Sequence, residues 1–221
     1  MQHTVRVWDL PTRVFHWALL FFVLGLVKTG LTGGEDMVWH FRCGYAVLSL
    51  LLFRIVWGLV GGHWSRFSSF IYAPSTVVNY VKGRSNPLHS VGHNPMGAGS
   101  VFAMLFFLLA QVGTGLFSDD DIASSGPLSK FVANSTVSLL TNYHKNIGKF
   151  VLLALVVLHI AAIVFYLVKK RENLVKPMLQ GDKVLAIAAV SAKDTAASRS
   201  FAAVVYMACA GLVALIVKLA G

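Results

Sequence analysis

The sequence predicts an all-α integral membrane protein, and three observations carry that prediction. Hydrophobic residues make up 56% of the 221 residues and charged residues only 13%, against about 25% charged residues in an average soluble domain. Five apolar runs are long enough to cross a bilayer, and the basic residues collect in alternate loops. A soluble fold of 24.0 kDa cannot bury this much apolar surface. The composition therefore excludes a soluble enzyme, a disordered chain and a secreted disulfide framework.

Each predicted span follows from the length of its apolar run. A membrane-spanning helix needs about 20 mostly apolar residues, and five runs satisfy this: residues 14–32, 41–60, 97–117, 147–168 and 201–219. The first run is interpreted as a retained span and not a cleaved signal peptide, because it is long and no small-residue cleavage site follows. The second run contains Arg42 and Arg54, which are costly in a bilayer unless they face protein, a ligand or an interface.

The charges predict the orientation of these spans. Twelve of the 19 Lys and Arg residues lie in residues 1–13, 61–96 and 169–200. The loops of the opposite side carry only Lys130 and Lys145. Five of the nine acids lie there: Glu35, Asp36, Asp119, Asp120 and Asp121. The positive-inside rule then places the N-terminus in the cytoplasm, and five spans place the C-terminus outside. The basic excess is thus interpreted as a topology signal and not as a nucleic-acid surface.

The two longer basic loops are expected to hold surface helices. Residues 61–96 contain a short apolar stretch that begins near Pro74 and stops at Gly83, which predicts an interfacial helix. A second such helix is predicted for residues 183–197.

Four of the eight histidines lie in or at the edge of predicted spans: His16, His40, His144 and His159. A single one could be an interhelical hydrogen-bonding residue or an interfacial anchor, but intramembrane histidines commonly mark function. The alternating span directions place His16 and His159 toward the cytoplasm and His40 and His144 toward the outside. His144 and His159 are 15 residues apart, about 22 Å along one helix and on one broad face.

Two levels of paired imidazoles are the arrangement that two bis-histidine b-type haems need. Zinc fits less well, because it takes three or four protein ligands at one point. The chain has no C-x-x-C-H segment, so the predicted haems are not attached through thioethers.

Neighbouring residues fit the same interpretation. Gly44 follows His40 by four residues and Gly148 follows His144 by four, which leaves room for a flat macrocycle one turn away, although glycine also serves helix packing. Arg42 near the outer pair and Arg54 in the inner half of the second span are candidates to bind haem propionates. Equally, each arginine could reach a lipid headgroup.

Three segments carry a resemblance to a known family. They are V-R-V-W-D-L-P-T-R-V-F-H-W in residues 5–17, W-H-F-R-C-G-Y with F-R-I-V-W-G in residues 39–58, and N-Y-H-K-N-I-G in residues 142–148 followed by L-H at residues 158–159. The combination resembles the bacterial cytochrome b561 family, which is similar to the b-type cytochrome subunits of nickel–iron hydrogenases. It implies a four-helix transmembrane bundle with two non-covalent b haems, ligated by His16 with His159 and by His40 with His144.

The resemblance covers about residues 5–170, so the chain departs from the family pattern at its C-terminal end. We expect a di-haem four-helix domain in residues 1–170, a cytoplasmic connector in 171–200 and a fifth transmembrane helix in 201–221. The fifth helix leaves the oligomeric state and the docking of partners open.

The resemblance implies a multi-pass protein of the bacterial inner membrane that carries electrons between the quinone pool and a periplasmic or membrane-attached partner, such as a c-type cytochrome. A hydrogenase membrane anchor and a superoxide:quinone oxidoreductase without a partner protein are the alternatives, so whether the chain is itself an enzyme stays open. A haem-free transporter or membrane anchor is the alternative from another class.

Overall fold

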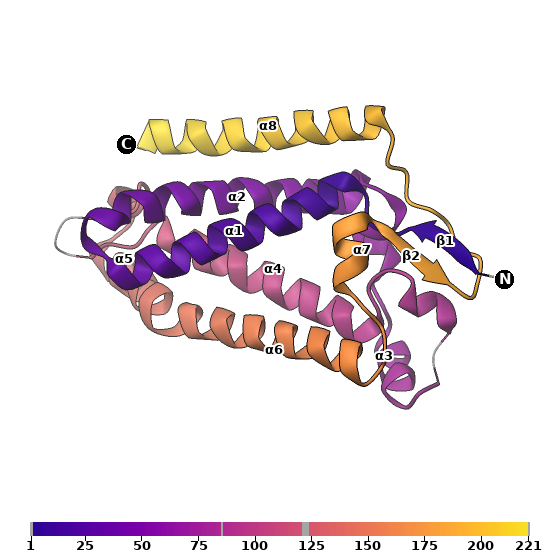
Figure 1. Cartoon of the computed structure of the whole chain (residues 1–221). Coiled ribbons are helices and arrows are strands. Elements are labelled where there is room, and N and C mark those ends of the chain that lie inside the picture. Colours follow the sequence, from indigo (N-terminus) through magenta and orange to yellow (C-terminus); the bar gives the residue numbers. More distant parts are fainter. Residues whose placement is uncertain (1, 85, 121–123, 221) are drawn as a thin grey trace. The chain divides into compact units, whose positions relative to one another are not determined.

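The computed structural model describes residues 2–84, 86–120 and 124–220, so Asp121 of the predicted outer acidic run lies outside the described residues. Within them, five helical stretches are long and apolar enough to cross a membrane, as predicted (Figure 1). They are α1 (Leu10–Thr32), α2 (Met37–Val60), α4 (Pro95–Gly115), the stretch Asn134–Val168, and α8 (Ala196–Ala220).

The fourth stretch is longer than its apolar run predicts. It consists of α5 (Asn134–Asn142), a π-helical segment (Tyr143–Gly148) and α6 (Lys149–Val168). The remaining elements include the short helices α3 (Pro74–Val81) and α7 (Val175–Gln180) and the strands β1 (His3–Arg6) and β2 (Asp182–Leu185).

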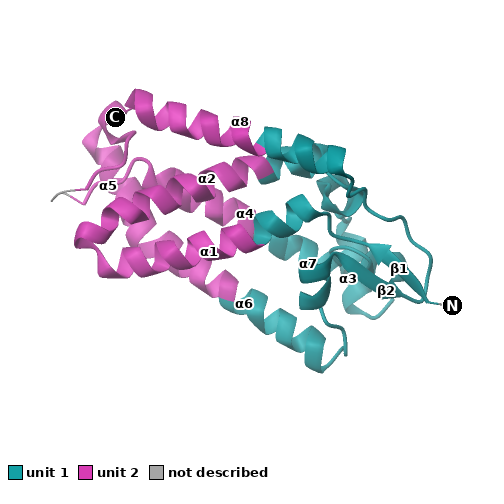
Figure 2. Cartoon of the chain, turned by 45° about the horizontal axis from the view of Figure 1, so that its top comes forward, with its two compact units in different colours: residues 1–16, 54–103, 157–205 teal, residues 17–53, 104–156, 206–221 magenta. Residues whose placement is uncertain are grey.

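The chain divides into two compact units, and each long helix contributes residues to both (Figure 2). Unit 1 comprises residues 1–16, 54–103 and 157–205. Unit 2 comprises residues 17–53, 104–156 and 206–221. Unit 1 thus contains the three segments that the charge pattern predicts on one side of the membrane.

Unit 1 folds these three segments around one apolar core. Strand β1 pairs antiparallel with β2, with His3 opposite Leu185. Val7 and Trp8 of the N-terminal segment pack with Trp64 and Val91 of the 61–96 loop and with Ala192 of the connector. The N-terminal segment, the first basic loop and the connector therefore lie together in unit 1, which is compatible with the prediction that all three lie on one side of a membrane.

One of the two predicted surface helices is confirmed and the other is wrong. Helix α3 begins at Pro74 and ends at Val81, and Gly83 follows with φ +75°, a conformation that suits glycine. Residues 183–197 do not form a surface helix of their own, and only the last two of them belong to a helix, α8. Instead Asp182–Leu185 is strand β2 and the chain stays irregular until α8 begins at Ala196, because its backbone pairs with β1 and not with itself.

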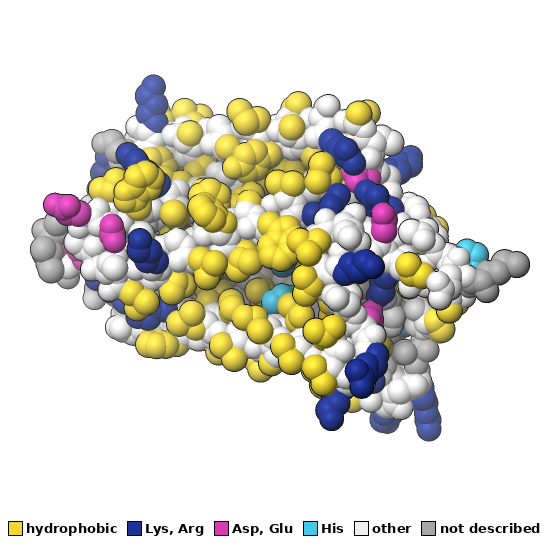
Figure 3. Space-filling view, in the orientation of Figure 1, with side chains coloured by type: hydrophobic (Ala, Val, Ile, Leu, Met, Phe, Trp, Pro, Cys, Tyr) yellow, Lys and Arg dark blue, Asp and Glu magenta, His cyan; other side chains and the backbone are white. Residues whose placement is uncertain are grey.

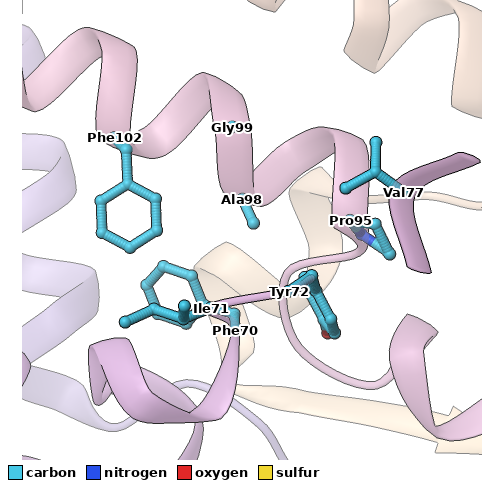
Figure 4. Close-up of a pocket in the computed structure, with 8 residues that line it drawn as sticks. All are labelled: Phe70, Ile71, Tyr72, Val77, Pro95, Ala98, Gly99 and Phe102. Carbon is cyan, nitrogen blue, oxygen red and sulfur yellow. The ribbon is translucent and has the colours of Figure 1, made fainter. Parts of the chain in front are cut away.

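Two carboxylates of the connector, Asp182 and Asp194, neutralise part of the positive charge of unit 1. Lys and Arg side chains gather over β1, β2 and α7 (Figure 3). Asp194 accepts from Arg6 at 2.7 Å and from Arg199 at 2.8 Å, and Asp182 pairs with Arg6. The hydrogen bond from Arg199, together with those from Leu10 N–H and Arg6, lowers the pKa of Asp194 to about 2.

Apolar side chains form the core cluster of unit 2. Val47 and Leu51 of α2 pack against Leu108 and Val112 of α4, and Leu152 of α6 borders the cluster. The fifth long helix packs along α2: the rings of Phe53 and Tyr206 lie 6.1 Å apart in unit 2, and those of Trp57 and Phe201 lie 6.2 Å apart in unit 1.

The outward faces of the long helices remain apolar. Figure 3 shows hydrophobic side chains over their surface. Phe21, Phe106 and Val157 are between 65% and 70% exposed, and none of the most apolar window of residues 134–168 is buried. Water would penalise such a surface, whereas lipid does not, so these helices are expected to face a bilayer.

Candidate cofactor sites

The inner histidine pair forms within unit 1. His16 lies in the second turn of α1, and His159 lies in the part of α6 that belongs to this unit. Their ring centres are 6.5 Å apart and the ring planes are inclined by 50°. Both side chains are partly buried.

The outer pair forms within unit 2. His40 lies in the first turn of α2 and His144 lies in the π-helical segment. Their ring centres are 6.2 Å apart with planes at 86°. Single π-helical turns occur frequently at functional sites, and this one carries the histidine.

The two spacings suit a metal ion held between two imidazoles. A metal–imidazole bond is about 2 Å long and a ring nitrogen lies about 1 Å from its ring centre, so two imidazoles that would hold one metal ion between them need centres about 6 Å apart. Two neutral rings that only pack against each other would have no reason to show nearly the same spacing in both pairs. The described residues contain no group of three or more His, Cys, Asp or Glu side chains suited to a metal ion, so the donor sets fit a macrocycle that supplies the other ligands.

Hydrogen bonds orient His144. Its Nδ1 lies 2.8 Å from the carbonyl oxygen of Gln111, and Gln111 Nε2 donates to the carbonyl oxygen of His144 at 2.9 Å. Because a carbonyl can only accept, Nδ1 carries the hydrogen and Nε2 keeps its lone pair. The residue is therefore fixed in the tautomer that ligates a metal through Nε2.

His40 is oriented in the same way. Its Nδ1 lies 3.1 Å from Thr29 Oγ1, and the Leu26 backbone also accepts from the ring. The single hydroxyl hydrogen of Thr29 is donated to the Gly25 carbonyl at 2.7 Å, so the oxygen accepts from His40. Nε2 of His40 is again left free for a metal.

Sequence reasoning missed a glycine beside each outer histidine. A Cβ at Gly30 would lie 3.2 Å from His40 Cε1, and one at Gly115 would lie 2.8 Å from His144 Cε1. Thr29 precedes Gly30, and Thr114, whose hydroxyl lies 3.5 Å from His144 Nδ1, precedes Gly115. The repeated tripeptide T-G-L in residues 29–31 and 114–116 is the signal that could have revealed them.

Gly44 and Gly148, the two glycines predicted to leave room for a macrocycle, differ in their surroundings. No atom lies within 4 Å of a Cβ built at Gly44, so this position is open. At Gly148 the Cβ position is filled by the Gln111 amide oxygen and the Tyr143 ring. Gly44 therefore remains the better candidate for a macrocycle contact, while Gly148 admits the side chain of the residue that orients His144.

The two predicted arginines also differ. Arg42 is exposed and its guanidinium lies 4.8 Å from the centre of the Trp39 ring. Arg54 is only 3% exposed, lies 4.7 Å from the centre of the Phe67 ring, and has no hydrogen-bond partner at Nη1 within the described chain. Arg54 is thus the arginine whose surroundings call for an anion.

His93 joins the inner site from the loop before α4. Its ring packs between Trp8 and Phe70, at 4.6 and 4.5 Å between centres. Burial above all, followed by the charge of Arg54, lowers the pKa of His93 to about 3. His93 is therefore a histidine with a buried Nδ1, although it lies in a loop.

The five apolar helices and the two histidine pairs fit a membrane protein of the cytochrome b type. The family model for prokaryotic cytochrome b561 matches residues 7–181. The chain belongs to this family, and it is a membrane b-type cytochrome.

Curated relatives agree with the family. The chain is 24% identical to a probable Ni/Fe-hydrogenase B-type cytochrome subunit of Rhizobium leguminosarum, with 83% of this chain and 90% of that protein covered. It is 26% identical to the protein of the same description from Azotobacter vinelandii, with 81% and 88% covered. No solved structure matched significantly.

Proposed function

We propose that this protein binds two b haems and transfers electrons across the bacterial inner membrane, between the quinone pool and a periplasmic or membrane-attached redox partner. The repeated spacing of the histidine pairs, 6.5 Å in unit 1 and 6.2 Å in unit 2, carries this proposal. His159 and His144 belong to one helical stretch, so each pair has one ligand on the same chain segment.

The proposed ligands are His16 with His159 and His40 with His144. Bound haem supplies an iron that accepts and releases single electrons. The protein holds the imidazoles, and Gln111 and Thr29 keep a lone pair on Nε2 of the outer histidines. Gly44, Gly148, Arg42 and Arg54 are proposed to contact or accommodate the haems.

The relatives favour a hydrogenase as the attached partner, since several are described as cytochrome subunits of that enzyme. In that version the cytochrome receives electrons from a docked hydrogenase and passes them to quinone. A soluble c-type cytochrome in the periplasm is the other partner that the proposal allows.

Reconstitution into liposomes tests this function. With a menaquinol or ubiquinol analogue in the bilayer and ferricyanide or cytochrome c outside, we expect reduced b-haem bands and sustained reduction of the acceptor. His159→Ala should stop the transfer, while replacement of the loop residue His63 by Ala, as a control, should not. Transfer that continues unchanged in His159→Ala liposomes would contradict the proposal, as would a colourless preparation from haem-replete cells.

A further inference from the structure

Arg54 is a buried cation without a paired anion. Its side chain is 3% exposed, and no carboxylate of the described residues lies within ion-pair distance of its guanidinium. Nη1 lacks a hydrogen-bond partner in the same part of the chain. A buried charge left in this state is strongly destabilising, so the site is expected to receive an anion.

Asp9, the acid that acts electrostatically on this arginine, already accepts hydrogen bonds from other residues. Asp9 is fully buried and interacts electrostatically with Arg54. Its Oδ2 accepts from Trp57 Nε1 at 3.1 Å, Gly62 N at 3.0 Å and Ser65 Oγ at 3.0 Å, and its Oδ1 accepts from Thr12 N at 2.9 Å. Asp9 therefore ties the start of α1 to the end of α2 and leaves Nη1 of the arginine unsatisfied.

His93 supplies a second nitrogen without a hydrogen-bond partner among the described residues, close to the inner pair His16 and His159. Its Nδ1 is buried and has no hydrogen-bond partner among the described residues. The ring lies within electrostatic range of Arg54, His16 and His159, which places it close to the inner pair. Trp8 and Phe70 fix its position from either side.

The aromatic residues hold the arginine in place as well. The Phe67 ring covers the guanidinium and packs 5.9 Å from Phe70. Gly58 follows Arg54 by one helical turn, and the Phe67 ring occupies the position where a Cβ at Gly58 would lie. This is a physical reason for the Arg-x-x-x-Gly spacing in F-R-I-V-W-G.

We propose that Arg54 and His93 together form the anion-binding half of the inner cofactor site and hold a propionate of the haem ligated by His16 and His159. This rests on the proposed function. Arg54 would supply Nη1 and His93 would supply Nδ1, both buried in unit 1 without a hydrogen-bond partner among the described residues, and charge-assisted hydrogen bonds to a carboxylate are the strong ones. In this proposal His93 binds the cofactor directly, although nothing in the sequence pattern marks it.

Resonance Raman spectra and redox titrations of the purified, haem-loaded protein test this. In Arg54→Gln and His93→Gln, the propionate deformation band of one haem should shift. In Arg54→Gln the reduction equilibrium of the same haem should move at least tenfold toward the oxidised form, which is about 59 mV for one electron. Arg54→Lys should restore most of the equilibrium but not the band. The double variant should shift less than the sum of the two single variants.

His89→Gln is the matched control. It lies in the same loop, and its Nδ1 is also without a partner within the described residues, but its ring packs on Tyr72. Unchanged propionate bands in fully haem-loaded Arg54→Gln and His93→Gln would overturn this inference and leave the proposed function standing. An equal shift in His89→Gln would overturn it too. Failure of the proposed function would instead appear as missing haem in the parent chain. If Arg54→Gln does not assemble, His93→Gln and Arg54→Lys decide the question.

Discussion

The position of one hydrogen atom on each ring decides whether the outer histidines can ligate a metal through Nε2. A histidine ligates a metal through Nε2 only if its hydrogen sits on Nδ1, and the Gln111 carbonyl and the Thr29 hydroxyl impose this on His144 and His40. Both acceptors lie on helices other than the one that carries the ligand. The packing of neighbouring helices therefore sets the chemistry of each imidazole.

Gly115→Ala should loosen the outer haem. The new Cβ would lie 2.8 Å from His144 Cε1, so the ring must move away from its acceptor, and loss of such a partner commonly costs 10–100-fold in metal affinity. We expect one of two haems to transfer faster to apomyoglobin. Gly113→Ala, on the same helix with open space at its Cβ, is the control. Equal transfer rates in both variants would contradict the role of Gly115.

At the residue scale, spacing and chemistry single out the four histidines as candidate ligands. The residues that lie beside them and fix their positions could not be predicted from the sequence. The four histidines stand out because imidazole is rare in apolar runs. Thr29 and Thr114 do not stand out, since threonine bonds to its own helix in many contexts. His93 looked like a loop residue, because burial by Trp8 and Phe70 arises only when the loop folds back.

At the scale of elements, the helices follow apolar length but their ends follow polar contacts. Apolar runs predicted the five spans to within a few residues in most cases. The fourth stretch begins at Asn134, well before its apolar run at Ile147, because hydrogen bonds from neighbouring helices hold the polar turn. Pairing of β1 with β2 links segments 176 residues apart in sequence, which no local pattern reveals.

The connector between β2 and α8 should open on acidification. The pKa of Asp194 is lowered from 3.8 to about 2 by the hydrogen bond from Arg199 and by those from Leu10 N–H and Arg6. A carboxylate with a depressed pKa stabilises the fold above its unfolded-state value, and this contribution disappears as the pH falls from about 4 through about 2. The protection factors of the amides of residues 186–195, which correct for the intrinsic pH dependence of exchange, should fall in that window.

Asp194→Asn should show the faster exchange already at neutral pH. Asparagine carries no charge to hold Arg6 and Arg199, and hydrogen bonds between charged groups are the stronger ones, so the local opening should become more frequent. Glu35→Gln, an exposed acid in the opposite loop, is the control. Protection factors of these amides in the parent chain that do not fall between pH 5 and 2 would contradict the role given to Asp194.

For the molecule as a whole, the distribution of basic residues along the chain and the fold of unit 1 group the same three segments together. The three basic segments predicted on one side build a common core in unit 1, although the positive-inside rule says nothing about contacts. Positions 35 and 82 are both exposed and belong to opposite predicted sides. They therefore report the orientation directly.

Cysteine labelling tests this orientation. In a background of Cys43→Ser and Cys209→Ser, the Glu35→Cys variant should react with a membrane-impermeant maleimide in intact spheroplasts. The Lys82→Cys variant should react only after permeabilisation, because its loop is predicted to be cytoplasmic. The reverse pattern would show that the N-terminus lies outside.

The number of haems per chain, and its change in single variants, tests the central claim most directly. Pyridine haemochrome analysis of the purified protein should give two b haems per chain. His159→Ala and His144→Ala should each give one, with the remaining haem differing between the two variants in its reduction potential. One haem in the parent chain, or two in either variant, would contradict the assignment of His16 with His159 and of His40 with His144.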